Sequence, residues 1–463
     1  MPSEELLSRS SRQGRLTLAT VTLGAGIALL DGTVVSIAVK SMGLGLHASL
    51  QQLQWVTNGY MLTLASLILV GGDLGDRLGR RRTYLVGVAG FGAASALCAL
   101  AQDPTQLILM RVVQGVFAAL LTPGSLAILQ STFRAEDRAW AIGRWAGVSG
   151  LATAAGPLVG GFLLDHGGWR WIFAINVPLC ALVLWFGRGI PETREATGAR
   201  RFDLPGAALG VLALAGSTYL LTSWREHPAS ALTAGLVALA AGAGFVRSER
   251  RPGAMVPLGL FASRVFTAAN LMTFLVYGAL GAGMFLLVMQ LEMTAGYGPT
   301  AAGLSSLPIA VMMLLFSARV AELAQRTGPR LPMSIGPMLC AVGMALLAGV
   351  RSSAPYWSSV FPGMLVFACG LTVLVSPLTA AVLGAAPEQH AGIASGINNA
   401  VARAGSLIAV AAIPAVVGLG GDAYRDPVIL TSGYRHAQLL CAALLLLGGL
   451  VSWRGLRPRV ETA

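Results

Sequence analysis

The amino-acid sequence predicts an all-α membrane protein with fourteen transmembrane helices and both termini in the cytoplasm. Of its 463 residues, 55% are hydrophobic and only 11% are charged, and the mean hydropathy is +0.70. Soluble domains carry roughly 25% charged residues. Apolar runs of the length that a helix needs to cross the hydrocarbon core, about 20 residues, recur along the whole chain. Composition therefore places the chain among the multi-pass membrane proteins.

Fourteen apolar segments qualify as spans, and each must be helical because lipid cannot satisfy the polar groups of an open backbone. The predicted spans cover residues 17–39, 53–72, 83–101, 105–130, 143–164, 170–188, 204–222, 230–246, 266–289, 302–320, 332–350, 357–382, 393–417 and 436–453. The 58 glycines fit this assignment, since small residues let membrane helices approach each other closely.

The placement of arginine orients these spans. Every second connecting segment carries a cluster of arginines, as at residues 77–82, whereas the segments between them carry isolated basic residues such as Lys40 and Arg170. Cytoplasmic segments of membrane proteins show this excess of positive charge. The alternation predicts an even number of spans and two cytoplasmic termini. It also explains the net charge of +12 without a nucleic-acid partner, because no basic face could follow a phosphate backbone.

The spans divide into two halves with an insertion between them. Two longer polar segments, 191–202 and 247–258, bracket the seventh and eighth spans. We therefore expect a six-helix bundle at 1–202, two additional helices at 203–248 and a second six-helix bundle at 249–463. A repeat supports the halves, since GGDLGDRLGRR at 71–81 aligns with VAELAQRTGPR at 320–330. Repeated halves are typical of secondary transporters, whose substrate site lies near the membrane midplane.

The segment at 71–81 resembles the loop motif between the second and third helices of the major facilitator superfamily. Asp76 and Arg77 can pair at a helix end while Gly79 permits a tight turn. In that family the motif latches the two halves on the cytoplasmic side. The alternative is a plain positive anchor, for which Asp76 and Gly79 would not be needed. The latch residues implied by the resemblance are Gly72, Asp73, Leu74, Asp76, Arg77, Gly79, Arg80 and Arg81.

Four further segments are similar to motifs of the fourteen-helix drug:proton antiporters within that superfamily. They are LLDGTVV at 29–35, RVVQGVFAALLTP at 111–123, GVSGLATAAGPLVGG at 147–161 and WRWIFAINVP at 169–178. The third resembles the antiporter motif, whose matching residues are Gly150, Gly156, Pro157, Gly160 and Gly161. The resemblance covers essentially the whole chain. It implies the major facilitator fold, with two pseudo-symmetric six-helix bundles plus two extra helices, and proton-coupled export of hydrophobic or cationic small molecules.

Asp31 is the sharpest candidate for proton coupling, because it lies near the middle of the first predicted span. A carboxylate at that depth costs about 2.5–3.5 kcal/mol on insertion scales, so it normally faces a cavity or a partner and marks function. Burial favours the protonated form, which would let Asp31 load and release a proton as water access alternates. The alternative is an acid that caps a broken helix near Gly32.

Two further charged residues are candidates for coupling. Arg111 lies early in the fourth span and never loses its charge, so it can only bias a neighbouring acid. The resemblance makes it a membrane-embedded cation with Asp31 as a candidate partner, and the alternative is an arginine that snorkels to the outer surface. Glu292, near the outer end of the span at 266–289, is a second protonatable candidate or a wetted loop acid.

Other polar and aromatic residues at membrane depth are candidates for the substrate cavity. They are Trp55, Asn58, Tyr60, Asn270, Tyr277, Gln290, Asn398, Asn399 and Arg403. Each could instead form a hydrogen bond between helices. As a set they outline a largely apolar cavity with sparse polar groups, which suits bulky amphipathic ligands.

Other classes of function find less support in the sequence than a drug exporter does. Lys40-Ser41 lacks the preceding glycines of a phosphate-binding loop, and the cysteines and histidines show no metal-ligand spacing, so we expect neither an enzyme nor a cofactor. A dedicated metabolite exporter, another solute transporter on the same fold, or a receptor without transport remain alternatives. The expected partners are a small-molecule substrate, protons driven by their gradient, and the lipid bilayer of a bacterial plasma or inner membrane. We expect a functional monomer.

Overall fold

The computed structural model describes residues 6–194, 203–224, 226–251, 256–386, 391–420 and 423–456, and these residues are almost entirely helical. The helices separate into two compact units. Unit 1 comprises residues 1–48 and 55–207, and unit 2 comprises residues 49–54 and 208–463. The predicted all-α class is confirmed.

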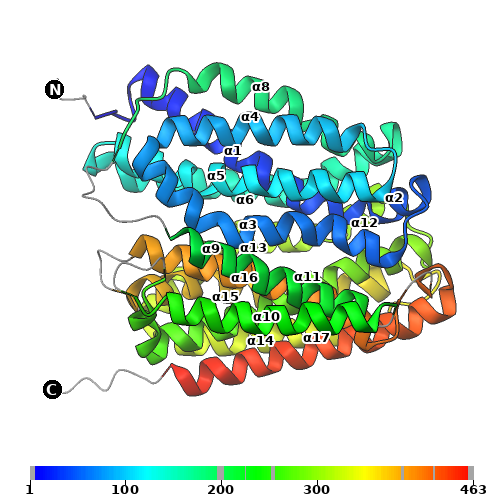
Figure 1. The fold of residues 1–463 in the computed structure, drawn as a ribbon. Helices are drawn as coiled ribbons and strands as arrows, with labels where there is room; N and C mark the ends of the chain where they lie inside the picture. Colours follow the sequence, from blue (N-terminus) through cyan, green and yellow to red (C-terminus); the bar gives the residue numbers. More distant parts are fainter. Residues whose placement is uncertain are drawn as a thin grey trace. The chain divides into compact units, whose positions relative to one another are not determined.

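Unit 1 is a helical bundle (Figure 1). Its helices are α1 (Arg12–Ile37), α2 (Val39–Gly45), α3 (Leu50–Leu78, in this unit from residue 55 on), α4 (Arg80–Ala99), α5 (Pro104–Thr132), α6 (Ala135–Gly167), α7 (Arg170–Ala174) and α8 (Asn176–Gly187). Helix α4 packs against α5 and α8, and α1 packs against α5, α6 and α8. Side-chain caps set two of the starts: Ser11 accepts a hydrogen bond from the Gly14 amide, and Asp103 accepts one from the Gln106 amide, as N-cap residues do.

The chain that precedes α1 is tied to the connection between α5 and α6. The Leu7 amide donates to the Thr132 carbonyl at 2.8 Å, and the Arg134 amide donates to the Leu7 carbonyl at 3.1 Å. The Arg9 amide donates to Asp137 Oδ2 at 2.9 Å. The backbone hydrogen bonds of Leu7 form an isolated parallel bridge with Phe133, the one β-type pairing within the described ranges.

Unit 2 is also a helical bundle. It contains α9 (Leu204–Ser223, in this unit from residue 208 on), α10 (Pro228–Ser248), η1 (Leu258–Ala262), α11 (Arg264–Met293), α12 (Pro299–Leu304), α13 (Leu307–Thr327), α14 (Arg330–Leu347), η2 (Tyr356–Val360), α15 (Phe361–Gly384), α16 (Ala391–Val416), η4 (Ala423–Arg425) and α17 (Pro427–Gly455). Helix α14 packs against α15 and α17, while α11 packs against α16 and α17. The predicted three-part division at 202 and 248 stays a prediction, because the two units differ from it by grouping α10 and most of α9 with the helices that follow.

Thirteen helical segments of the described chain are long and apolar enough to cross a membrane. They account for every predicted span except 143–164. That span lies within α6, a helix of 33 residues, which is not among the thirteen. The count of fourteen and the cytoplasmic placement of both termini therefore remain predictions.

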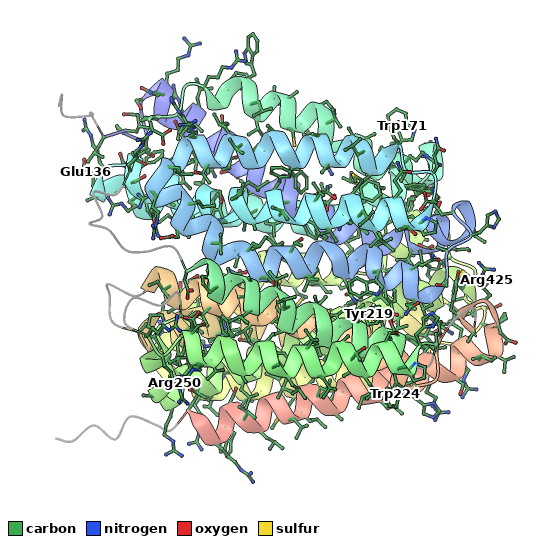
Figure 2. All side chains as sticks on the ribbon, viewed as in Figure 1. Glu136, Trp171, Tyr219, Trp224, Arg250 and Arg425 are labelled. Carbon is green, nitrogen blue, oxygen red and sulfur yellow. The ribbon has the colours of Figure 1, made fainter. Side chains whose placement is uncertain are left out.

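The outer surface of the helices is apolar, as a lipid-facing surface must be. Leu239 on α10 and Leu314 on α13 are 74% and 76% exposed. Exposed tryptophans lie near helix ends, among them Trp171 on α7 and Trp224 just after α9 (Figure 2). Tryptophan is enriched at the two membrane interfaces, so these residues fit a bundle surrounded by lipid.

Candidate functional site

Asp31 and Arg111 form a buried ion pair inside unit 1. Arg111 Nη1 lies 2.6 Å from Asp31 Oδ2, and each residue is 1% exposed. Helix α1 is continuous through Asp31, so this carboxylate does not cap a broken helix. The Arg111 side chain turns toward Asp31 and does not snorkel to the surface. The structure thus brings together the two residues that the sequence marks as candidate partners, and their role in proton coupling stays a prediction.

Three neutral side chains complete the surroundings of the carboxylate. Gln114 Nε2 and Asn176 Nδ2 donate to Asp31 Oδ1 at 3.1 and 3.0 Å. The same two nitrogens donate to Ser95 Oγ at 2.7 and 3.3 Å. Gln114, Asn176 and Ser95 are each 0% exposed. With Arg111, Asp31 therefore meets three donors, an arrangement that suits an ionised carboxylate because that group only accepts hydrogen bonds.

Arg111 is held on every side. Its Nε donates to the Val56 carbonyl of α3 at 3.1 Å, and its Nη1 also donates to Gln114 Oε1 at 2.6 Å. The guanidinium carbon lies 4.3 Å from the centre of the Tyr60 ring and 5.7 Å from that of Phe173. Aromatic faces attract cations at these distances. The arginine is thus fixed by contacts from α3, α5 and α7.

Local sequence explains how these side chains converge. Gln114 follows Arg111 by three residues on α5, a spacing that places both on one face of a helix. Asn176 is the first residue of α8, immediately after the break that separates α8 from α7. Pro178 fits the first turn of α8, where the amide that proline lacks would have no partner within the helix.

Sequence reasoning missed Gln114, Asn176 and Ser95. The only available signal was that Gln114 and Asn176 lie inside quoted motifs, at 111–123 and 169–178. Tyr60, predicted as a cavity residue, lies over the Arg111 guanidinium, and its hydroxyl donates to the Ala28 carbonyl at 3.4 Å.

The antiporter-motif glycines pack against α1 directly after Asp31. A Cβ added at Gly156 would overlap Thr33 Oγ1, and one added at Gly160 would lie 2.8 Å from Val34 Cγ1. The predicted close packing is present at these two positions. Pro157 and Gly161 lie in the same helix α6, whereas the surroundings of Gly150 lie outside the described residues.

The loop motif pairs its charges differently from the prediction. Asp73 pairs with Arg77 at 2.9 Å and Asp76 with Arg80 at 2.8 Å, so the expected Asp76–Arg77 pair is wrong. Asp73 and Arg77 lie four residues apart on α3, where such residues face each other, whereas the Asp76–Arg80 pair joins the end of α3 to the start of α4. The turn between α3 and α4 does fall at Gly79, whose φ is +111°, a backbone region that glycine enters without strain.

Glu192, which sequence reasoning did not single out, caps the start of α4. Its Oε1 accepts from the Arg81 amide at 3.0 Å and its Oε2 accepts from the Arg82 amide at 3.1 Å. Arg81 Nε lies 3.6 Å from the same carboxylate. A Cβ at Gly79 would lie 2.6 Å from Glu192 Oε1, so the glycine also makes room for this cap. These contacts lie within unit 1, and the role of Gly72, Leu74 and their neighbours as a latch stays a prediction.

Three of the candidates in unit 2 form hydrogen bonds between elements. Asn398 Nδ2 on α16 donates to Asn270 Oδ1 and Thr273 Oγ1 on α11, at 3.1 and 2.9 Å. Gln290 Nε2 on α11 donates to Thr431 Oγ1 on α17 at 3.1 Å. Each of these residues thus makes the kind of bond between helices that was the alternative to a cavity role, and the cavity role itself stays a prediction.

The remaining candidates differ in their burial and surroundings. Glu292 is 3% exposed within α11 and is not a wetted loop acid. Tyr277 lies within electrostatic range of Arg403, and Asn399 is exposed. In unit 1, Trp55 is half-buried, and Asn58 is 1% exposed with no hydrogen-bond partner for its amide among the described residues.

Comparison with known proteins gives consistent matches over the whole chain. A family model described as Major Facilitator Superfamily matches residues 21–410. The tetracenomycin C resistance and export protein of Streptomyces glaucescens is 34% identical over 421 residues, covering 89% of this chain and 77% of that protein. The methylenomycin A resistance protein of Bacillus subtilis (strain 168) is 32% identical over 470 residues, covering 100% and 98%.

A solved structure shares the fold. An auto-inhibited peptide transporter of the POT family superposes with a TM-score of 0.70 at 15% sequence identity, covering 96% of this chain and 99% of that chain. At this identity the likeness shows the fold alone.

Proposed function

Because the chain belongs to the Major Facilitator Superfamily, we propose that it is a proton-coupled exporter of hydrophobic or cationic small molecules, antibiotics among them. We assign it to the fourteen-helix drug:proton antiporters of that superfamily and expect it to work as a monomer without a cofactor. The observation that carries the proposal is the Asp31–Arg111 ion pair, buried inside a bundle of membrane helices. Intramembrane charges are rare and mark ion pathways and proton relays.

The ion pair gives protonation a mechanical effect. When Asp31 is ionised, its attraction to Arg111 ties α1 to α5. A proton arriving from outside removes the negative charge, while Arg111 keeps its bonds to Val56 and Gln114. The attraction between α1 and α5 then weakens, and the bundle can open its interior to the other side of the membrane. Each inward charge releases about 2.3 kcal/mol per about 100 mV of membrane potential, which can drive export.

The names of the relatives support export of antibiotics and leave open how broad the substrate range is. The relative from Streptomyces glaucescens is named for resistance to and export of one compound, tetracenomycin C. This name favours a second candidate, an exporter dedicated to a single metabolite. The two candidates differ in whether unrelated lipophilic cations are transported.

Transport by the purified protein in liposomes tests the proposal. With an acid interior, molecules inserted inside-out should accumulate ethidium and tetraphenylphosphonium, together with antibiotics of several classes. In Asp31→Asn, uptake should fall to the level measured without a pH gradient, because the variant has no group to carry the proton. Uptake of a single antibiotic and of neither cation would identify a dedicated exporter.

A matched control separates coupling from general damage. Glu136 lies exposed in the first turn of α6 (Figure 2), many residues before Gly156, which packs beside Thr33. Glu136→Gln should therefore transport as the parent does. Undiminished gradient-driven uptake by Asp31→Asn would remove Asp31 from the mechanism.

A further inference from the structure

Asn176 uses only one end of its buried amide group. Its Nδ2 donates to Asp31 Oδ1 and to Ser95 Oγ. Its Oδ1 has no hydrogen-bond partner among the residues that the structure describes, although the residue is 0% exposed. Buried side-chain oxygens are rarely left without a partner. This unused acceptor lies on the side chain that contacts the candidate proton carrier.

Gln114, whose amide also donates to Asp31, uses both ends of its amide group. Its Nε2 donates to Asp31 and Ser95, while its Oε1 accepts a 2.6 Å hydrogen bond from Arg111. Turning the Gln114 amide around would break that bond and place two donors against each other. Turning the Asn176 amide around breaks no bond made by its oxygen.

A protonated Asp31 would need an acceptor that its present partners do not offer. A carboxylic acid carries one O–H donor, yet Arg111, Gln114 and Asn176 all present N–H groups to Asp31. A half turn about the terminal torsion of Asn176, which is broad and roughly two-fold, would exchange its nitrogen for its oxygen. The oxygen could then accept from the Asp31 hydroxyl and from Ser95, because a serine hydroxyl donates as well as accepts.

We propose that Asn176 is a positioning residue that serves Asp31 in both protonation states, as a donor to the carboxylate and as an acceptor from the acid. The step adds one proton to Asp31, turns the Asn176 amide and rotates the Ser95 hydroxyl. The two hydrogen bonds donated by Asn176 Nδ2 are lost, and two bonds accepted by its Oδ1 replace them. The inference rests on the proposed function, since it concerns the same carboxyl group. It adds a residue that gives the hydroxyl of protonated Asp31 an acceptor, while the Asn176 nitrogen moves to the position that its oxygen now occupies.

Few other titratable groups face Asp31. Arg111 faces it from α5, and the thiols of Cys98 on α4 and Cys180 on α8 are close enough to interact with it electrostatically. Tyr60 of α3 and Phe173 of α7 face the arginine, and α6 presents Gly156 and Gly160 to α1. Buried thiols in apolar surroundings stay uncharged, so among the described residues Arg111 is the charged group that faces Asp31.

Infrared difference spectroscopy during a pH titration tests this role on the purified full-length protein, with no substrate present. The carbonyl stretch of protonated Asp31 is identified as the band that Asp31→Asn removes. The test variants are Asn176→Leu, which is similar in size but neither donates nor accepts, and Asn176→Thr, whose hydroxyl does both. Val183→Ala, two turns further along α8, is the matched control.

In Asn176→Leu the band should move to higher wavenumber, because the Asp31 hydroxyl loses its acceptor. Its titration midpoint should move to higher pH, because a hydrogen bond to a charged group is worth more than one between neutral groups, so the carboxylate loses more than the acid. Asn176→Thr should recover part of both shifts, and Val183→Ala should titrate as the parent does.

Two results would overturn the proposal. An unchanged band position in both Asn176 variants would mean that Asn176 only donates, and an unchanged midpoint would mean that it does not support the carboxylate. If Asn176→Leu fails to fold, the partial shifts of Asn176→Thr decide alone. The titration needs no transport, so failure of the liposome assay and failure of this inference are distinguishable.

Discussion

At the scale of single residues, Arg111 binds its neighbours through a geometry that lysine could not copy. Its Nε reaches the Val56 carbonyl while its Nη1 reaches both Asp31 and Gln114. A planar guanidinium holds several donors at fixed angles, whereas an ammonium group is a single point charge on a flexible stem. Arg111 is therefore both the partner of the carboxylate and the group that orders the side chains around it.

Removing the cation should destabilise the protein. Arg111→Met leaves Asp31 buried without an opposite charge, and breaking a buried pair in this way costs about 3–5 kcal/mol. Thermal unfolding of the purified protein in detergent should show a lower melting temperature. Adding Asp31→Asn to the same chain should recover part of the loss, because the uncompensated charge is then gone. A double variant as unstable as Arg111→Met alone would mean that charge is not the cause.

The charged residues of the site were predictable and its neutral residues were not. Asp31 and Arg111 stand out because a charge inside an apolar run needs a reason. Gln114, Asn176 and Ser95 carry no charge, and a neutral polar residue in a membrane helix is as easily a simple bond between helices. Asn398 and Gln290 illustrate that second outcome. A neutral residue of the site differs from one that only joins two helices because α4, α5 and α8 bring the former together around Asp31, and the sequence does not show this convergence.

At the scale of elements, the contact between α1 and α6 depends on glycine at defined positions. A Cβ at Gly156 would overlap Thr33, two residues after Asp31, whereas a Cβ at Gly147 on the same helix would meet nothing within 4 Å. The two positions therefore form a matched pair for substitution by alanine.

Gly156→Ala should lower the free energy of unfolding by about 1–3 kcal/mol, the usual range for overpacking a tight contact. Gly147→Ala should change it by less than about 0.5 kcal/mol, as most changes away from contacts do. Melting temperatures in detergent, with proton leakage through liposomes as a second measure, check both variants. Equal behaviour of the two would argue against a packing role for the antiporter motif.

The connection between α3 and α4 shows what a motif can and cannot predict. The position of the turn at Gly79 followed from the sequence, because glycine favours tight turns. The ion pairs did not, since Asp73 pairs with Arg77 four residues along α3, and Asp76 pairs across the turn with Arg80 of α4. The cap by Glu192 depends on a segment more than a hundred residues away in sequence, which no local pattern reports.

At the scale of the whole molecule, α6 decides the count of spans. If α6 crosses the membrane, its two ends lie on opposite sides, and the chain has fourteen spans. Glu136 in its first turn and His166 in its last turn are both exposed. Among the five cysteines of the chain, four are buried and Cys369 is half-buried, so introduced cysteines can be labelled over a low background.

A membrane-impermeant maleimide should label His166→Cys in intact cells and Glu136→Cys only after the cells are opened. This expectation follows from the arginine clusters, which place the start of α6 on the cytoplasmic side. The unmodified protein gives the background. Labelling of both residues from the same side would reduce the count to thirteen spans and reverse the orientation of every later segment.

Hydropathy predicted the spans well and their ends poorly. The last predicted span, 436–453, lies inside α17, which runs over Pro427–Gly455. Hydropathy marks only the part of a helix that contacts lipid, whereas helix ends are set by local hydrogen bonds. Here Asp426 accepts from the amides of Val428 and Ile429, as an N-cap residue does. The division of the chain into bundles depends on contacts between distant segments and was accordingly less predictable.

The ion pair and all of its hydrogen-bonding partners come from unit 1. Substitutions confined to unit 2 therefore leave every residue of this cluster in place. Under the proposed function, chimeras that keep unit 1 and take unit 2 from a relative should therefore retain proton coupling while their substrate range changes.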